Sequence, residues 1–433
     1  MKIALIGAGS YVFAPMAIYD AIVSAQTMDI ELALVDKDAE MLEAMSGYAQ
    51  KAAEAEGVCM KISAETDRCR ALPGADFIIL CAAVQGQKRW ETDRDILVKH
   101  GLSHQARECG GVAGLSSTLR QIKLAMDVAS DMKQLCPQAI LLDVANPMPR
   151  VLAAVNNFTR ITAYGFCQAA TGGPIGYPWF ARLLGREIDE IDVVTAGLNH
   201  FAWLLSIREK SSGRDLYADV LAALKTHEQD NWEWRLMLKW YREYGLLPAG
   251  AVSHHAEHLP PDPDVLHDYA NHSPFHGGQN EREARLAVLR EIAEGKKDYH
   301  DALQNGSWEH PVWFADALYN KKTVYSPAIN IRNEGYIQGI PAGVTVEAPI
   351  LIENGKVVPR QIDGLPPALL QLLNNVAEAQ TAAVRAGVDH YKKEPSGWAE
   401  KAIDADFAIP PEEKERAKAA LREMMQAHYD IIN

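Results

Sequence analysis

The first 200 residues alternate short apolar segments with stretches of helical periodicity, and this alternation limits the possible folds more than any other feature. Each apolar segment is short and nearly free of polar residues, as strands are when helices cover both faces of a parallel sheet. The sequence therefore predicts an α/β fold that begins with a Rossmann-type, doubly wound sheet. The predicted strands of this sheet cover residues 2–6, 30–35, 76–82, 139–144 and 161–166.

The pattern changes after residue 200, where helices dominate and the second half reads as a mixed α+β domain. Asn354-Gly355 lies between apolar flanks and predicts a hairpin turn. We expect two domains: a Rossmann domain over 1–196 and an α+β domain over 197–433. The elements predicted in the second domain are a strand over 203–208 and helices over 215–227, 230–244, 366–386 and 411–430, with a long loop over 248–278.

The composition argues against several classes of partner. A net charge of −14 disfavours nucleic acid and anionic membrane surfaces, which both need clustered Lys and Arg. No apolar run reaches the roughly 18 residues of a membrane span. The six cysteines show no paired spacing, which predicts reduced thiols and a cytoplasmic protein. A small-molecule partner is expected instead.

A glycine-rich turn, Gly7-Ala8-Gly9-Ser10-Tyr11-Val12, follows the first predicted strand and matches GxGxxG except that Val replaces the last glycine. The two glycines let the backbone turn sharply and approach a pyrophosphate at the start of the next helix. Asp36 lies 27 residues beyond Gly9, where an acid hydrogen-bonds the adenosine ribose. This pattern predicts a dinucleotide site that favours NAD over NADP, with a plain βαβ unit as the alternative.

Cys167 and His200 each follow a predicted strand, the first over 161–166 and the second over 192–196. We expect both side chains to meet at the carboxyl ends of parallel strands, where open α/β sheets bind ligands. A thiolate and an imidazole suit a divalent transition metal, and two protein ligands leave positions open for substrate oxygens. The alternative is a buried core cysteine and a hydrogen-bonded histidine.

Together with Asn146-Pro147 and Gly197-Leu198-Asn199-His200, these residues resemble glycoside hydrolase family 4, the NAD- and manganese-dependent glycosidases. The resemblance covers most of the chain and extends to residues 330–355 and 364–366. It implies a fold similar to lactate and malate dehydrogenases. It also implies an enzyme that cleaves O-glycosidic bonds of a small carbohydrate with bound NAD and Mn²⁺ or another divalent metal.

The resemblance implies that the 1–196 domain binds NAD and that the 197–433 domain serves substrate, metal and oligomer contacts. It also assigns positions in this chain to the cofactor, the metal and the substrate. Cys167 and His200 match the family's metal ligands. Asn146 matches the asparagine between the nicotinamide and the sugar, and Asn199 matches a second substrate contact. The predicted cofactor contacts are Gly7, Gly9, Ser10, Tyr11, Val12, Asp36, Ala83 and Asn146.

The sequence departs from the family pattern at three places. The glycine-rich loop appears only as ECGGVAGLSSTLR, from Glu108 onward. The residue after the metal cysteine, typically Asn in phospho-glycosidases and His in several galactosidase- and uronidase-like members, is Gln168. The acid expected near Val252 is missing, although His254-x-x-Glu257 is retained. The catalytic candidates are therefore His254, Tyr244 and Glu257, with His255 as a further candidate for the base.

The resemblance implies redox-assisted elimination in place of the two-carboxylate chemistry of most glycosidases. NAD takes a hydride from C3, the metal polarises the ketone, a base removes the C2 proton and the group at C1 leaves. Water then adds and the hydride returns, so no net oxidation occurs.

Two other classes remain open at this point. A hydroxy-acid or polyol dehydrogenase shares Asp36 and Asn146 but needs a His–Asp relay and an Arg clamp, and has no need of Cys167. An NAD-sensing regulator explains the fold but not the pair of metal-type ligands. The sugar, its anomer and the substituent at C6 are left open, and a homodimer or homotetramer is expected by analogy with the fold.

Overall fold

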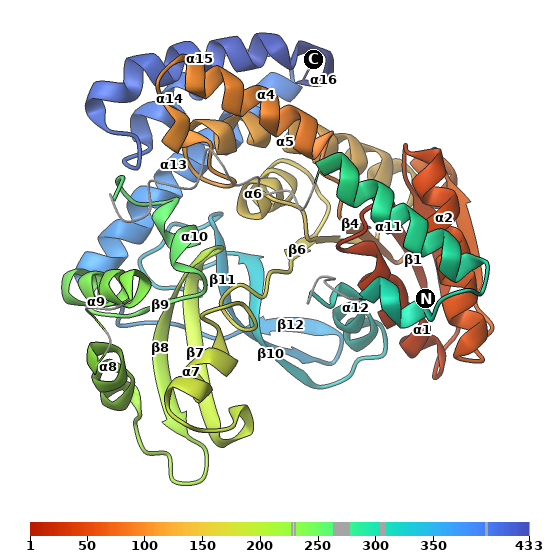
Figure 1. Ribbon diagram of the computed structural model, residues 1–433, viewed down its shortest axis with the longest axis horizontal. Helices are drawn as coiled ribbons and strands as arrows, with labels where there is room; N and C mark the ends of the chain where they lie inside the picture. The colour runs from red at the N-terminus through yellow and green to blue at the C-terminus, as the bar shows by residue number, and fades with distance from the viewer. Residues whose placement is uncertain (227, 229–230, 263–277, 304–308, 395–396, 433) are drawn as a thin grey trace.

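The computed structural model describes residues 1–433 apart from 227, 229–230, 263–277, 304–308, 395–396 and 433, and apart from the side chains of 278–279. The stretch 263–277 of the predicted 248–278 loop therefore lies outside the described residues. One mixed sheet runs through the described part of the molecule with helices packed around it (Figure 1). This arrangement confirms the predicted α/β class.

The sheet contains 12 strands among the described residues, in the order β3-β2-β1-β4-β5-β6-β10-β11-β7-β8-β9, with β12 paired to β11. The strands from β3 to β6 pair in parallel, and every pair beyond β6 is antiparallel. Their bounds are β1 (Lys2–Ile6), β2 (Glu31–Val35), β3 (Lys61–Glu65), β4 (Phe77–Leu80), β5 (Ile140–Asp143), β6 (Ala163–Gly165), β7 (Ile191–Leu198), β8 (Phe201–Glu209), β9 (Pro248–Ala249), β10 (Val324–Arg332), β11 (Thr345–Glu353) and β12 (Lys356–Pro359).

The helices of the first half alternate with the parallel strands, as the sequence pattern predicts. Asp38 shows why one of them begins where it does, because its side chain accepts a hydrogen bond from Met41 N and caps α2. The bounds are α1 (Ala14–Ala25), α2 (Ala39–Ala55), α3 (Arg68–Ala71), α4 (Gly86–Lys99), α5 (Gly111–Leu135), α6 (Met148–Phe158) and α7 (Tyr177–Leu183), with 3₁₀ turns η1 (Ser103–Gln105) and η2 (Ile188–Glu190).

The helices of the second half return to pack on the first half. In Figure 1, α13 to α16 form one layer with α4 and α5, while α11 lies across α2. The bounds are α8 (Tyr217–Thr226), α9 (Trp232–Tyr244), α10 (Val252–Ala256), α11 (Gly278–Ala293), α12 (Pro311–Tyr319), α13 (Pro367–Tyr391), α14 (Trp398–Ala405), α15 (Lys414–Ala427) and α16 (Tyr429–Ile432), with η3 (Tyr299–Leu303) and η4 (Pro411–Glu413).

The strand before His200 differs from the sequence prediction. β7 is not a parallel strand, because it pairs antiparallel with β8 on one side and with β11 on the other. His200 lies in the tight turn between β7 and β8, with φ of 59°, and not at the free end of a parallel strand. The apolar run of β7 reads alike in both arrangements, so the sequence could not distinguish them. The predicted domain boundary at 196/197 falls within β7 and stays a prediction.

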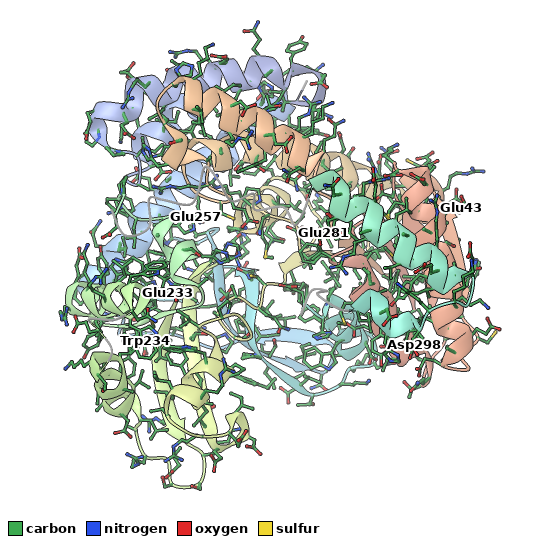
Figure 2. The ribbon with its side chains drawn as sticks, viewed as in Figure 1. Glu43, Glu233, Trp234, Glu257, Glu281 and Asp298 are labelled. Carbon is green, nitrogen blue, oxygen red and sulfur yellow. The ribbon has the colours of Figure 1, made fainter. Side chains whose placement is uncertain are left out.

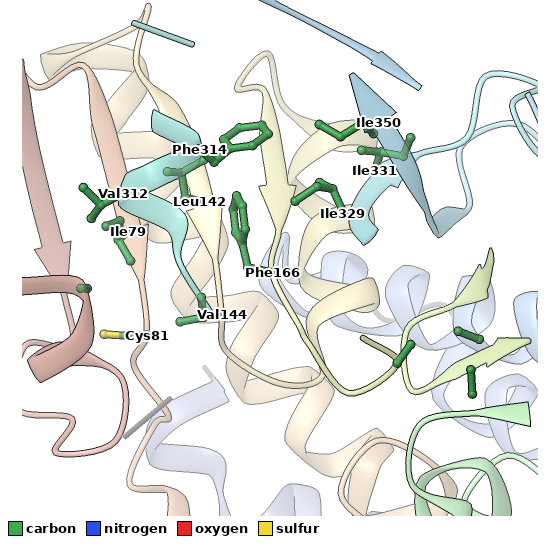
Figure 3. Packing of buried hydrophobic residues seen from close by; sticks show 14 of the residues in the cluster. Ile79, Cys81, Leu142, Val144, Phe166, Val312, Phe314, Ile329, Ile331 and Ile350 are labelled. Carbon is green, nitrogen blue, oxygen red and sulfur yellow. The ribbon is translucent and has the colours of Figure 1, made fainter. Parts of the chain in front are cut away.

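Buried aromatic packing fixes the end of β6, where Cys167 follows. The rings of Phe166 and Phe314 meet edge to face with centroids 5.1 Å apart (Figure 3). The ring centroid of Tyr164 lies 5.2 Å from that of Phe314. Phe314 comes from α12, so this helix is held against the sheet beside the cysteine. Burial of each aromatic side chain contributes roughly 1.5–3 kcal/mol.

Asn354 and Gly355 adopt positive φ values of 52° and 73° and form the predicted hairpin turn between β11 and β12. Within the described residues, no helix combines the length and apolar character needed to cross a membrane.

Candidate functional site

The glycine turn packs tightly between the ends of β1, β2 and β4. Gly7 has φ of 94°, and a Cβ there would lie 2.6 Å from the backbone nitrogen of Ala82. Gly9 N donates a 2.7 Å hydrogen bond to Asp36 Oδ2, and a Cβ on Gly9 would lie 2.8 Å from the same oxygen. Only glycine fits at both positions, so the turn keeps the close backbone approach that a dinucleotide requires.

The other predicted cofactor contacts lie on the same turn or on its neighbour. Ser10 Oγ accepts a hydrogen bond from Phe13 N, directly before α1. Tyr11 lies among the charges of Glu281, Arg282 and Arg285 on α11. Val12 is partly exposed.

The segment after β4 completes this end of the parallel sheet. Ala83 is exposed there, and Gln121 of α5 holds its neighbours with hydrogen bonds of 3.0 Å each to Val84 N and Ala82 O. The predicted cofactor residues therefore share one edge of the parallel sheet.

A compact group of metal-type side chains lies beyond this edge. Ligand atoms of Glu108, His200 and His254 all lie within 4.8 Å of one another. Cys109 Sγ lies 3.6 Å from His200 Nδ1. Asn146 Nδ2 donates a 2.8 Å hydrogen bond to Glu108 Oε1, which joins this group to the predicted nicotinamide side. Carboxylate, imidazole and thiol donors together fit a divalent transition metal.

Burial sets the charge states of this group. Desolvation lowers the pKa of His200 well below its usual value, with the charges of His254, His258 and His255 acting in the same direction. Desolvation also lowers the pKa of His254. Both imidazoles are therefore neutral near pH 7 and keep a lone pair for a metal or a proton. Burial and the nearby charge of Glu257 raise the pKa of Glu108 to about 8.

Cys167 lies two residues after the end of β6 and is partly exposed. Desolvation and the charges of Glu309 and Glu347 raise the pKa of its thiol well above the usual value, while a side-chain hydrogen bond from Asn199 lowers it. Metal coordination is a way to stabilise the thiolate here. The structure thus connects Cys167 with the His200 turn through Asn199, the residue next to His200.

Asn199 is itself held by a buried carboxyl group. Glu347 Oε2 accepts hydrogen bonds from Asn199 Nδ2 at 3.3 Å and from Asn330 Nδ2 at 3.2 Å. Burial raises the pKa of Glu347 to about 7. Asn199 is only 1% exposed, so in this structure it braces the Cys167 side of the site.

The three catalytic candidates lie in different surroundings. His254 stacks on His200, and its Nδ1 is buried without a hydrogen-bond partner in the described structure. Glu257, at the end of α10 (Figure 2), accepts hydrogen bonds from Cys109 N at 2.7 Å and Gly110 N at 3.2 Å. Tyr244 packs edge to face on Trp203, with ring centroids 5.7 Å apart. The structure therefore brings His254 and Glu257 to the metal-type group, whereas Tyr244 packs on Trp203.

The further base candidate, His255, points into the sheet. Its Nε2 lies 2.8 Å from the carbonyl oxygen of Ala202 in β8, and burial lowers its pKa to about 4. It fastens α10 to β8 and thereby fixes the position of His254.

Sequence reasoning missed Glu108 and Cys109 as members of the site. Arg107 Nη1 donates a 2.7 Å hydrogen bond to the carbonyl oxygen of Glu257, and a Cβ on Gly110 would lie only 2.1 Å from that oxygen. This contact locks the segment before α5 against α10. The sequence did contain a signal: Glu108 and Cys109 stand directly before Gly110 and Gly111, the glycine pair at the start of the long helix α5.

Comparison with known proteins agrees with these observations. The sequence profile described as "Family 4 glycosyl hydrolase" matches residues 2–174, and the profile of its "C-terminal domain" matches residues 195–394. An α-galactosidase of Bacillus subtilis (strain 168) is 25% identical over 403 residues, which cover 90% of each chain.

Two solved structures share the fold of the whole chain. Both are of a 6-phospho-α-glucosidase from gut microorganisms. One, in complex with NAD and glucose-6-phosphate, has a TM-score of 0.83 at 20% identity, covering 100% of this chain and 99% of the other. The second, in complex with NAD and Mn²⁺, has a TM-score of 0.81 at 20% identity, covering 99% and 98%.

Proposed function

The chain belongs to the family 4 glycosyl hydrolases and is a glycosidase, and we propose that it works with bound NAD and a divalent cation. The observation that carries this proposal is the group of Glu108, His200 and His254, whose ligand atoms lie within 4.8 Å of one another. Asn146 links this group to the nicotinamide side through Glu108. Membership of this family argues against the two alternatives, a dehydrogenase and an NAD-sensing regulator.

Separate sets of residues in this chain would bind the dinucleotide and the cation. Gly7, Gly9 and Asp36, with Ser10, Tyr11, Val12 and Ala83 beside them, would hold the dinucleotide. His200, Cys167 and Glu108 would hold the cation. When bound, the two groups supply reversible hydride transfer and polarisation of sugar oxygens.

The protein groups then govern the proton and the sugar. His254 is neutral and buried, and its Nδ1 has no hydrogen-bond partner in the described structure, so it is the group we propose to take the C2 proton. Asn146, whose side chain donates a hydrogen bond to Glu108, is the group we propose to orient the sugar. Glu257 acts as a positioning residue, because its carboxylate accepts the backbone N–H groups of Cys109 and Gly110.

The test uses 4-nitrophenyl α- and β-glycosides, phosphoglycosides and uronides with NAD, Mn²⁺ and a thiol reductant. Cleavage of at least one glycoside is expected, and omission of NAD or exhaustive chelation is expected to abolish it. Cleavage that persists without both groups contradicts the proposal. Accumulation of NADH without release of nitrophenol would instead indicate a dehydrogenase.

Two further properties complete the proposal. All six cysteines, which lie among the described residues, are free, and this supports a reducing compartment such as the cytoplasm. A homodimer or homotetramer is proposed from the fold type alone. The partner that the site takes is a small carbohydrate.

A further inference from the structure

The thiol of Cys109 lies beside the ring of His200. Its Sγ is 3.6 Å from His200 Nδ1, which is a hydrogen-bonding distance for sulfur, and both side chains are buried. Cys109 belongs to the glycine-rich loop in which this chain departs from the family pattern, and its side chain has no role in the proposed function. His200, in contrast, is a proposed ligand of the cation. The contact therefore joins a thiol without a role to a residue that the metal site needs.

A partner at Nδ1 determines which nitrogen of His200 is left for the cation. An imidazole that binds a metal is neutral, so it has one N–H group and one lone pair, on nitrogens that point in different directions. Such a ring usually donates its remaining N–H to an acceptor, which fixes both its tautomer and its orientation. Cys109 Sγ is the acceptor that the structure places at Nδ1. Nε2 of His200 then keeps the lone pair.

The position of the thiol favours this role over direct ligation of the cation. Glu108, His200 and His254 form a group whose ligand atoms all lie within 4.8 Å of one another. Cys109, although it is among the described residues, is not a member of this group. Its sulfur is therefore close to the ring of His200 but outside the set of atoms that would surround the cation.

The surrounding structure fixes both partners of this contact. Cys109 N donates a 2.7 Å hydrogen bond to Glu257 Oε2, and a Cβ on Gly114 would lie 2.6 Å from the carbonyl carbon of Cys109. The first turn of α5 thus packs directly on this residue. His254 stacks on His200 with ring centroids 4.1 Å apart. The ring of His200 is therefore held at its edge by Cys109 and on its face by His254.

We propose that Cys109 is a positioning residue of the metal site. Its sulfur accepts the Nδ1–H of His200, which selects this tautomer and directs Nε2 toward the cation. The inference rests on the proposed function, because it requires a cation on His200. It adds the residue that sets the geometry of this ligand.

The first experiment compares Mn²⁺ binding by the NAD-loaded wild type, Cys109→Ala and Cys109→Ser, measured by electron paramagnetic resonance under reducing conditions. In Cys109→Ala the affinity should fall about tenfold, which is typical when a metal-binding histidine loses its hydrogen-bond partner. In Cys109→Ser a hydroxyl replaces the acceptor, so most of the affinity should return. If the side chain served packing alone, Ser would do no better than Ala, because a buried hydroxyl group is costly.

Cys136 provides the matched control, since it is a buried cysteine at the opposite end of α5. Cys136→Ala and Cys136→Ser should leave the Mn²⁺ affinity unchanged, and NAD affinity by calorimetry should be unchanged in all four variants. Equal Mn²⁺ affinity in the wild type and Cys109→Ala, or lower affinity in Cys109→Ser than in Cys109→Ala, overturns the inference but leaves the proposed function standing. A wild-type protein that binds no Mn²⁺ contradicts the proposed function itself.

The tautomer of His200 can be observed directly by ¹⁵N nuclear magnetic resonance of histidine-labelled protein. The sample is the wild type loaded with NAD and Zn²⁺, which has no unpaired electrons. We expect the proton of His200 on Nδ1 and the shift of a metal-bound nitrogen at Nε2, and His200→Gln identifies the two signals. A proton on Nε2, with the metal on Nδ1, overturns the inference.

The optical spectrum of the Co²⁺-loaded protein separates positioning from ligation. A thiolate bound to Co²⁺ gives a sulfur-to-metal charge-transfer band, and Cys167 is the expected source of this thiolate. At saturating Co²⁺ the band should keep its intensity in Cys109→Ala and disappear in Cys167→Ser. A weaker band in Cys109→Ala would make Cys109 a second thiolate ligand and overturn its role as an acceptor for His200.

Discussion

The imidazole ring of His254 lies stacked on that of His200, with ring centroids 4.1 Å apart and planes 17° from parallel. His200 comes from the turn between β7 and β8, and His254 from the short helix α10. Two features of the chain impose this contact: the positive φ of His200 and the fastening of α10 to β8 by His255. The contact therefore holds the proposed base, His254, beside the predicted metal ligand, His200.

The separate roles of these two histidines lead to a prediction for metal binding. His200→Ala and Glu108→Gln should each weaken Mn²⁺ binding by at least tenfold, since each loses a ligand, or about 1.4 kcal/mol. His254→Ala should keep most of the Mn²⁺ affinity and lose turnover. Electron paramagnetic resonance titration of Mn²⁺ measures the affinities, and His300→Ala, at an exposed position, is the control. Equal loss of metal in His254→Ala would make His254 a ligand instead of the base.

The contact between Gly9 and Asp36 gives a prediction for the cofactor. Asp36→Ala removes both the predicted ribose acceptor and the 2.7 Å hydrogen bond that orders the glycine turn. NAD affinity should fall at least tenfold, in keeping with about 1.5–3 kcal/mol for a hydrogen bond to a charged group. Calorimetric titration of NAD measures this, and Glu65→Gln at the end of β3 is the control. Unchanged affinity would refute our placement of the cofactor.

Glu347 gives a prediction for stability as a function of pH. Burial raises its pKa in the folded protein to about 7 from the ordinary 4.5, so the folded state binds the proton more tightly than the unfolded state. Its contribution to stability is therefore present below about pH 4.5 and is lost as the pH rises to about 7. The total loss is at most about 3 kcal/mol.

Urea unfolding of the metal-free protein at pH 5 and pH 7 measures this effect. Glu347→Gln cannot ionise, so its free energy of unfolding should fall less than that of the wild type between the two values. Identical pH dependence in the two proteins would mean that Glu347 does not titrate in this window.

A buried charge cluster ties the carboxyl end of the chain to α4 and α5. Asp93 pairs with His428 at 2.7 Å and with Arg120 at 2.9 Å, and Asp93 and His428 are each only 1% exposed. Asp93→Ala should lower the free energy of unfolding by about 3–5 kcal/mol, because Arg120 stays buried without its partner. Asp95→Ala, on the exposed face of the same helix, should cost less than about 1 kcal/mol. Chemical denaturation measures the free energy of unfolding of both variants, and equal losses in the two would contradict this prediction.

The sequence was sufficient for the parallel half of the fold and for its nucleotide edge. The reason is that both signals are local in the sequence. Each strand there is a short apolar run, and the turn needs glycine at Gly7 and Gly9 because a Cβ would not fit. The antiparallel half was harder, because β7 is buried on both faces and its apolar run reads like that of a parallel strand. The pairing of β7 with β8 and β11 depends on contacts between strands, which the local sequence pattern of β7 does not reveal.

The site was predicted only where a side chain stands next to a recognisable motif. Cys167, His200 and His254 met that condition as candidates; the structure brings His200 and His254 together with Glu108, and the role of Cys167 as a metal ligand stays a prediction. Glu108, Glu309 and Glu347 did not, because each reaches the site through packing between distant segments. Glu309, for example, is brought to Gln168 by the contact of Phe314 with Phe166. An isolated acid in a sequence gives no sign of such a neighbour.

The sharpest prediction concerns the C2 proton of the sugar. If a residue of this site removes that proton during turnover, the proton exchanges with solvent before it is returned. Hydrolysis in D₂O should therefore place deuterium at C2 of the released sugar, while the hydrogen at C3 is largely retained. Substrate deuterated at C2 should also react more slowly where proton removal limits the rate. Carboxylate-pair hydrolysis breaks neither bond. Nuclear magnetic resonance of the product distinguishes the two outcomes, and protium alone at C2, with cleavage that needs no NAD, would rule out elimination while leaving the protein a glycosidase.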